Sequence, residues 1–146
     1  MNTTYKLVIT LFTCFAFLIG SSQSNEWISI GKFNDTDYYL RLNKTNYDGT
    51  KKVWIKSVSK NLESVSKTGK KVSLPNGYRL MLQEYNCSDR QTRMLSLTDY
   101  NSNGDVFSSH KFESYEIEWV DVLPDSVGEI LLNKVCKLFN SSSSDL

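Results

Sequence analysis

The chain is poor in alanine and histidine, and these scarcities limit what it can be. Ala16 is the only alanine and His110 the only histidine among the 146 residues. Because alanine is the best helix former, its near absence favours a sheet. A single histidine, without a second imidazole or a paired thiolate, gives no metal site of the usual kind. We therefore expect a β-rich domain without a metal centre.

Catalytic motifs are missing as well. The sequence has no glycine-rich phosphate loop and no serine nucleophile elbow. Glu116 and Glu118 alternate as paired carboxylates would, but a solvated strand edge is the favoured interpretation. His110 is interpreted as structural or solvated. The sequence thus predicts no catalytic residue and no cofactor, and indicates a protein that is not an enzyme.

A strong charge of one sign is also lacking, since the formal net charge is +1. A globally basic nucleic-acid-binding protein is therefore not indicated. The charges are unevenly placed, with an acidic stretch from Asp99 to Glu129. The basic stretch contains the candidate partner-binding residues Lys51, Lys52, Lys56, Lys60, Lys67, Lys70 and Lys71. Two interpretations stay open: a pair of solvated faces, or a basic loop that docks an acidic partner or another copy of the chain.

Residues 1–24 have the three parts of a cleavable signal peptide. Lys6 gives a positive start, residues 7–19 are apolar and uncharged, and small or polar residues follow up to Ser24. A membrane anchor is the alternative, but the apolar run is shorter than the roughly 20 residues that span a bilayer. We expect cleavage before Asn25 and a location in the periplasm, at the cell surface or outside the cell.

Export also decides how the three cysteines are interpreted. Cys14 lies inside the apolar run, with more apolar residues after it, so it is expected to be an ordinary residue of the signal and not a lipidation site. Removal of the signal leaves Cys87 and Cys136. An even number of cysteines in an exported chain predicts a disulfide between them. A eukaryotic secreted protein is a further possibility that the sequence leaves open. In such a protein, the four Asn-x-Ser/Thr sequons would be glycosylation sites; they begin at Asn34, Asn43, Asn86 and Asn140.

Short apolar stretches between turn residues predict antiparallel strands. The expected strands are 27–30, 37–42, 52–58, 77–86, 91–100 and 105–112, with a further short strand within 115–122. Residues 46–49 predict a turn, and Asn103-Gly104 predicts a hairpin of type I′. The polar residues 59–76 predict a long loop with a short helical turn around Leu62 and Val65.

One helix is predicted, from Ser126 to Phe139. Ser126 and Glu129 have capping-box spacing, and apolar residues recur at helical spacing after them. The serine-rich residues 140–146 predict a disordered tail. Strand parity puts Cys87 on the side of Met81 and Tyr85. Either a bulge precedes Cys87, or the helix packs on the Met81 and Tyr85 side of the sheet.

An ordered set of short motifs resembles the surface-adhesin protein E family of Gram-negative bacteria. These motifs are Tyr85-Asn86-Cys87, Arg93, Asn103-Gly104, Trp119, Pro124-Asp125-Ser126 and Val135-Cys136-Lys137. The resemblance covers most of residues 25–139. It implies an α+β fold, namely a twisted antiparallel sheet of about six strands with one C-terminal helix packed on it and tethered by the disulfide.

The resemblance also implies a non-enzymatic binding module. Its expected partners are host matrix or serum proteins such as vitronectin and laminin, and a homodimer is a further expectation. The alternative is a soluble periplasmic domain that binds another protein or a small ligand, such as a haem-like molecule between helix and sheet. A filled interface under the helix would argue against that ligand site.

Overall fold

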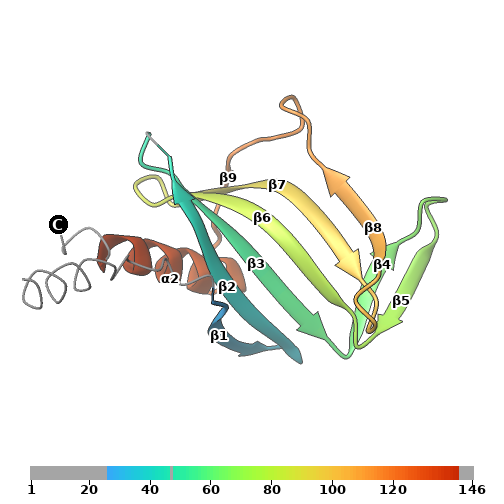
Figure 1. The fold of residues 1–146 in the computed structure, drawn as a ribbon. Helices are drawn as coiled ribbons and strands as arrows, with labels where there is room; N and C mark the ends of the chain where they lie inside the picture. Colours follow the sequence, from blue (N-terminus) through green and yellow to red (C-terminus); the bar gives the residue numbers. More distant parts are fainter. Residues whose placement is uncertain (1–25, 47, 142–146) are drawn as a thin grey trace, which may run out of the picture.

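The structure is a computed structural model that describes residues 26–46 and 48–141; it has one curved antiparallel sheet with a helix on one face (Figure 1). The strands of this sheet are β1 (Ile28–Phe33), β2 (Thr36–Thr45), β3 (Lys51–Ser59), β6 (Tyr78–Asn86), β7 (Gln91–Tyr100), β8 (Val106–Lys111) and β9 (Val120–Asp121). Their order is β1-β2-β3-β6-β7-β8, and β9 pairs with β7. A separate hairpin consists of β4 (Asn61–Val65) and β5 (Lys71–Pro75), and the helix is α2 (Val127–Ser141).

The predicted fold class is confirmed. The main sheet has seven strands, all of its pairings are antiparallel, and the C-terminal helix is joined to the end of β6 by the Cys87–Cys136 disulfide. The helix continues to Ser141, two residues beyond the predicted end. The predicted signal peptide and residues 142–146 of the predicted tail lie outside the described residues. No helix within the described ranges is long and apolar enough to cross a membrane.

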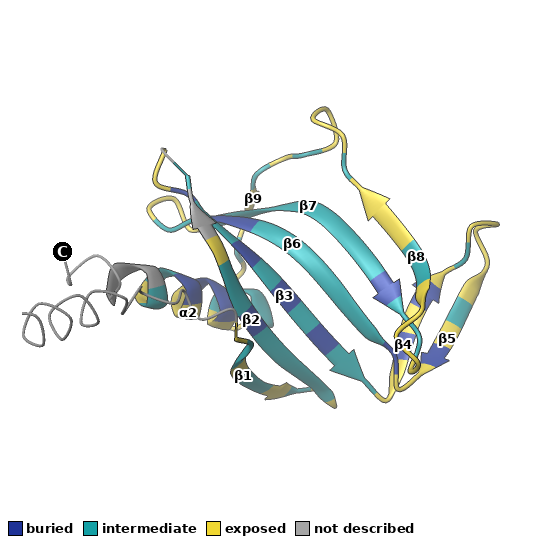
Figure 2. Ribbon diagram, viewed as in Figure 1, coloured by how far each residue is buried: buried dark blue, intermediate teal, exposed yellow. Residues whose placement is uncertain are grey.

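The core lies between α2 and one face of the sheet, which we call the inner face. Its members are Leu40, Val53, Ile55, Tyr85, Leu131, Leu132 and Val135, each at most 5% exposed. Tyr85 belongs to this core and Met81 packs against it. The helix therefore packs on the Met81 and Tyr85 side, which is the second of the two predicted solutions for Cys87. Figure 2 shows buried residues on α2 and the strands beside it, and a second set on β4 and β5.

The start of α2 follows the capping prediction in part. The Glu129 backbone N–H donates to Ser126 Oγ over 3.2 Å, as a capping serine requires. The Glu129 carboxylate accepts from the backbone N–H of Asp125 over 2.9 Å, and not from that of Ser126. It also pairs with Arg90, in the turn between β6 and β7. The helix start is thus fixed to the β6–β7 turn by an ion pair, and the disulfide fixes the helix again at Cys136.

The prediction of a loop over residues 59–76 was wrong, because this segment forms β4, a turn and β5. Burial alternates along β4, where Leu62 and Ser64 are buried and their neighbours are exposed. Leu74 of β5 lies opposite Leu62 and is buried with it. This period of two is typical of a strand. However, the only apolar residues at the buried positions of β4 and β5 are Leu62 and Leu74. The surrounding serine and lysine residues gave the segment the composition of a loop.

The type I′ turn predicted at Asn103-Gly104 was also wrong, although β7 and β8 do pair as a hairpin. The Asn101 N–H donates to Asp105 O and the Gly104 N–H donates to Asn101 O, so the loop has three residues and not two. Gly104 has a positive φ of 88°, whereas Asn103 does not have the positive φ that a type I′ turn requires. The further short strand expected within residues 115–122 is present as β9, which consists of Val120 and Asp121.

Candidate functional site

A pocket of about 530 Å³ lies where the β4–β5 hairpin faces β7 and β8. One wall is formed by residues 63–67, at the end of β4 and in the turn after it, together with Lys71. The other wall is formed by Leu97 of β7 and by residues 108–110 of β8. Arg79 and Asp99 lie between the walls on the inner face. The pocket is therefore at the opposite end of the sheet from α2 (Figure 1).

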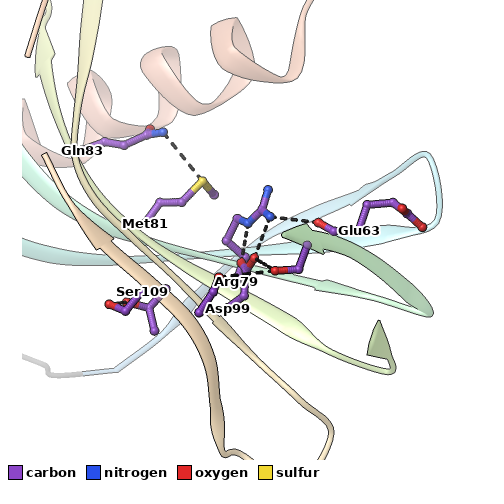
Figure 3. A network of polar contacts seen from close by, with 9 residues as sticks. Glu63, Arg79, Met81, Gln83, Asp99 and Ser109 are labelled. Atoms are coloured by element: carbon purple, nitrogen blue, oxygen red, sulfur yellow. Dashed lines mark hydrogen bonds and ion pairs between the residues drawn. The ribbon is translucent and has the colours of Figure 1, made fainter. Parts of the chain in front are cut away.

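The base of the pocket is an ion pair between neighbouring strands. Arg79 and Asp99 are directly opposite each other in the β6–β7 register. Arg79 Nε donates to Asp99 Oδ1 over 2.6 Å, and Nη2 donates to Asp99 Oδ2 over 2.9 Å. Ser64 Oγ of the hairpin donates to the same Oδ2 over 2.5 Å. Figure 3 shows this network, which connects the hairpin to the sheet.

The guanidinium of Arg79 is held in one orientation by three acceptor contacts. Besides Asp99, its Nη2 reaches the backbone oxygen of Glu63 over 3.0 Å. Hydrogen bonding to Asp99 raises the pKa of Arg79 above its usual value, against the opposing effect of burial. The remaining nitrogen, Nη1, has no hydrogen-bond partner among the described residues. Because the side chain is 28% exposed, this nitrogen can donate to a group that enters the pocket.

The rim of the pocket carries further titratable side chains. Lys67 and Lys71 lie on the hairpin side, and both are exposed. His110 lies on the β8 side, where its ring packs edge-on against Phe112 with centroids 4.5 Å apart. Its Nε2 is 3.7 Å from Glu116 Oε2. The cations lining the pocket outnumber the carboxylates by one, and one of those carboxylates, Asp99, is already paired with Arg79.

The structure does not bring the seven predicted lysines into one cluster. Only Lys67 and Lys71 line the pocket. Lys52 pairs with Glu84 over 3.1 Å, and Lys56 lies 4.5 Å from the ring centroid of Tyr78. Lys51 is opposite Tyr85 in the β3–β6 register. Exposed Lys60 and Lys70 do not line the pocket.

A second polar network lies on the outer face, around Glu84. This carboxylate is 2% exposed and accepts hydrogen bonds from Asn46 over 2.7 Å and from Arg93 over 2.6 Å. Burial alone raises the pKa of Glu84, but the hydrogen bonds from Asn46, Lys52 and Arg93 outweigh it, so the pKa is lower than usual. Arg93 also stacks on Trp119 at 4.4 Å. The two cations of this network, Lys52 and Arg93, are both paired with the Glu84 carboxylate, so we interpret the network as structural.

The interface under α2 offers no comparable space. Leu131, Leu132 and Val135 are at most 5% exposed and pack against Ile55 and Tyr85 of the sheet. Core side chains therefore fill the space between helix and sheet where the alternative prediction placed a haem-like ligand. The pocket at the hairpin end is therefore the candidate site for a small ligand.

Glu116 and Glu118 were interpreted as a solvated strand edge, but they lie outside any strand, in the segment that leads to β9. Glu116 accepts from the backbone N–H of Glu113 over 2.7 Å, and both carboxylates are exposed. No cluster of three or more histidine, cysteine, aspartate or glutamate side chains able to hold a metal exists in the described part of the chain.

Sequence reasoning missed Ser64, Arg79 and Asp99. The signal was partial, because Asp99 has the strand parity of Leu95 and Leu97, whereas Arg79 shares parity with Met81 and Gln83 and not with the more apolar Leu80 and Leu82. A charged residue on the apolar side of a strand predicts a buried partner, so the sequence could have indicated Asp99 but not Arg79. Ser64 could not be found this way, because its contact depends on the hairpin that was predicted as a loop.

These features define the class of protein as a disulfide-tethered α+β domain, sealed under its helix and open under its hairpin. The family model of surface-adhesin protein E matches residues 27–137, so the chain belongs to this family. The match spans all of the described strands and most of α2. Searches of the curated proteins and of the solved structures found no match.

Proposed function

We propose that the chain is an exported, non-enzymatic binding module that engages a host matrix or serum protein at the cell surface. The observation that carries this proposal is the family match over residues 27–137. The Cys87–Cys136 disulfide supports export, since such bonds persist in oxidising compartments. Residues 1–24 serve in this proposal as the signal peptide that directs the chain out of the cytoplasm.

The proposal is tested by measuring binding of the mature chain, from Asn25 onward, to immobilised vitronectin and laminin. Serum albumin is the control surface, because it reports non-specific adsorption. We expect saturable binding to at least one matrix protein and none to albumin. Equal binding to all three surfaces, or to none, would contradict the proposal.

The alternative is a soluble periplasmic domain for a small ligand, and the pocket favours it. A volume of about 530 Å³ lies within the range of small-molecule sites. Fractionation of the native cells separates the two functions. A protein found only in the soluble periplasm would rule out adhesion, whereas surface labelling of intact cells would support it.

A further inference from the structure

We propose that the pocket under the hairpin is the docking site for an extended, acidic segment of a protein partner. This inference rests on the proposed function, because it names the part of the module that meets the partner. It is argued from the two walls of the pocket, from the fixed cation between them, and from the lysines at the rim.

The wall contributed by β8 is the free edge of the main sheet. The Phe112 N–H donates to Leu95 O of β7, and the register then directs the backbone groups of Ser108 and His110 toward β7. The N–H and C=O groups of Ser109 and Lys111 consequently face away from the sheet. An extended segment can pair with such an edge through its main chain.

The wall contributed by β4 has a free edge of the same kind. The Ser66 N–H donates to Lys70 O across the hairpin, so the backbone groups of Glu63 and Val65 face away from β5. The Glu63 carbonyl is taken by Arg79, as described above. The Val65 N–H and C=O stay directed outward. Two strand edges that border one groove favour a segment in β conformation over a compact ligand.

The cation at the base selects the charge of that segment. Two of the three guanidinium nitrogens of Arg79 are held by Asp99, which is 1% exposed, while Nη1 is left to donate. A donor fixed in this way loses little conformational entropy when it binds a carboxylate. Lys67 and Lys71 add positive charge beside it. Leu97 and Val65 supply apolar surface for the residues that flank the acidic side chain.

The test titrates the mature chain with the probe peptide Ac-Thr-Val-Glu-Val-Thr-NH2 and follows backbone amide shifts by NMR. A matched peptide has Gln in place of Glu, and hexanoate is the free carboxylate probe. We expect shifts at residues 63–67 and 108–110, with at least tenfold weaker binding of the Gln peptide and of hexanoate. Hexanoate binding as tightly as the Glu peptide would overturn the proposal in favour of a small-molecule site.

Two double variants separate the pocket lysines from their neighbours. Lys67→Glu/Lys71→Glu reverses both charges at the rim, and Lys60→Glu/Lys70→Glu makes the same change in net charge at exposed positions that do not line the pocket. We expect the first variant to lose at least tenfold in peptide affinity and the second to lose less than twofold. Equal losses would mean long-range attraction only and would overturn the site.

The same variants distinguish a failure of this inference from a failure of the proposed function. If wild-type protein binds a matrix protein and the rim variant binds it equally well, the function stands and the site is wrong. If no matrix protein binds while the Glu peptide still binds at the pocket, the site stands and the proposed partner class is wrong. Loss of matrix binding only in the rim variant supports both.

Discussion

The two ends of the inner face differ sharply, although they lie on the same strands. Under α2 the side chains are apolar and sealed, with Ile55, Leu132 and Val135 at most 1% exposed. Under the hairpin the central contact is the Arg79–Asp99 ion pair, and a pocket stays open beside it. The difference indicates that the helix end supplies stability, while the hairpin end is free to supply recognition.

The gradient between these ends is visible along β6 alone. Tyr85, Gln83, Met81 and Arg79 follow one another on the inner face, from the sealed end to the open one. Gln83 links the two ends, because it accepts from Tyr85 OH over 2.5 Å and its amide lies 4.0 Å from the sulfur of Met81. One face of β6 thus contributes to the core at one end and to the pocket at the other. Figure 3 shows Gln83, Met81 and Arg79 along this face.

The largest expected effect is on the helix end, from Cys87→Ser/Cys136→Ser. The bond joins residues 49 apart, and closing a loop of that length stabilises a fold by about 4 kcal/mol in the chain-entropy model. Urea unfolding should show a loss of this size, with a melting temperature many degrees lower. A loss below about 1 kcal/mol would mean that packing alone holds the helix.

The elements of the fold could be predicted from the sequence because their signals were local, whereas the packing of the helix on the sheet was implied by the family resemblance. Alternation of apolar residues gave the strands, Ser126 and Glu129 gave the helix start, and two cysteines in an exported chain gave the disulfide. The strand limits were less accurate, because β2 continues through polar residues to Thr45. Pairing in the sheet satisfies the backbone there, and side-chain patterns do not record it.

The site was harder to predict because it depends on contacts distant in sequence. Ser64 and Asp99 are 35 residues apart, and they meet only because the hairpin folds onto the inner face. Lysine density marked residues 51–71 as a candidate stretch, and of its seven lysines Lys67 and Lys71 line the pocket. It could not separate these from Lys52, which faces Glu84 on the other side of the sheet.

An intermediate effect should distinguish the two ends directly, through Leu132→Ala and Leu62→Ala. Truncating a buried leucine costs about 2–5 kcal/mol where the surroundings cannot collapse. Leu132 is 1% exposed in the main core, so its loss should reach about 3 kcal/mol and weaken hydrogen-exchange protection in every strand of the sheet.

Leu62 is 7% exposed in the two-stranded hairpin, so Leu62→Ala should weaken protection in β4 and β5 while the main sheet is unchanged. The same variant should reduce binding of the Glu peptide, because a frayed β4 loosens one wall of the pocket. If Leu62→Ala lowered protection throughout the sheet, the two ends would form one cooperative unit, and the division of roles proposed here would be wrong.

The smallest expected effect concerns the buried carboxylate of Glu84, on the outer face of the sheet behind the helix. The pKa of Glu84 is lowered in the folded protein, so its contribution to stability is present above the unfolded pKa of about 4.3 and is lost as the pH falls through the folded pKa. Wild type should therefore lose stability in that acidic range, and Glu84→Gln should lose less of it.

Glu118→Gln is the matched control, since Glu118 is exposed and outside the network. Glu84→Gln should be less stable than wild type at pH 7, because Lys52 and Arg93 then face a neutral partner while only 21% and 28% exposed. Urea unfolding at pH 7, 5, 4 and 3 measures both effects. Parallel pH profiles for wild type and Glu84→Gln would show that the acid sensitivity of the helix end arises elsewhere.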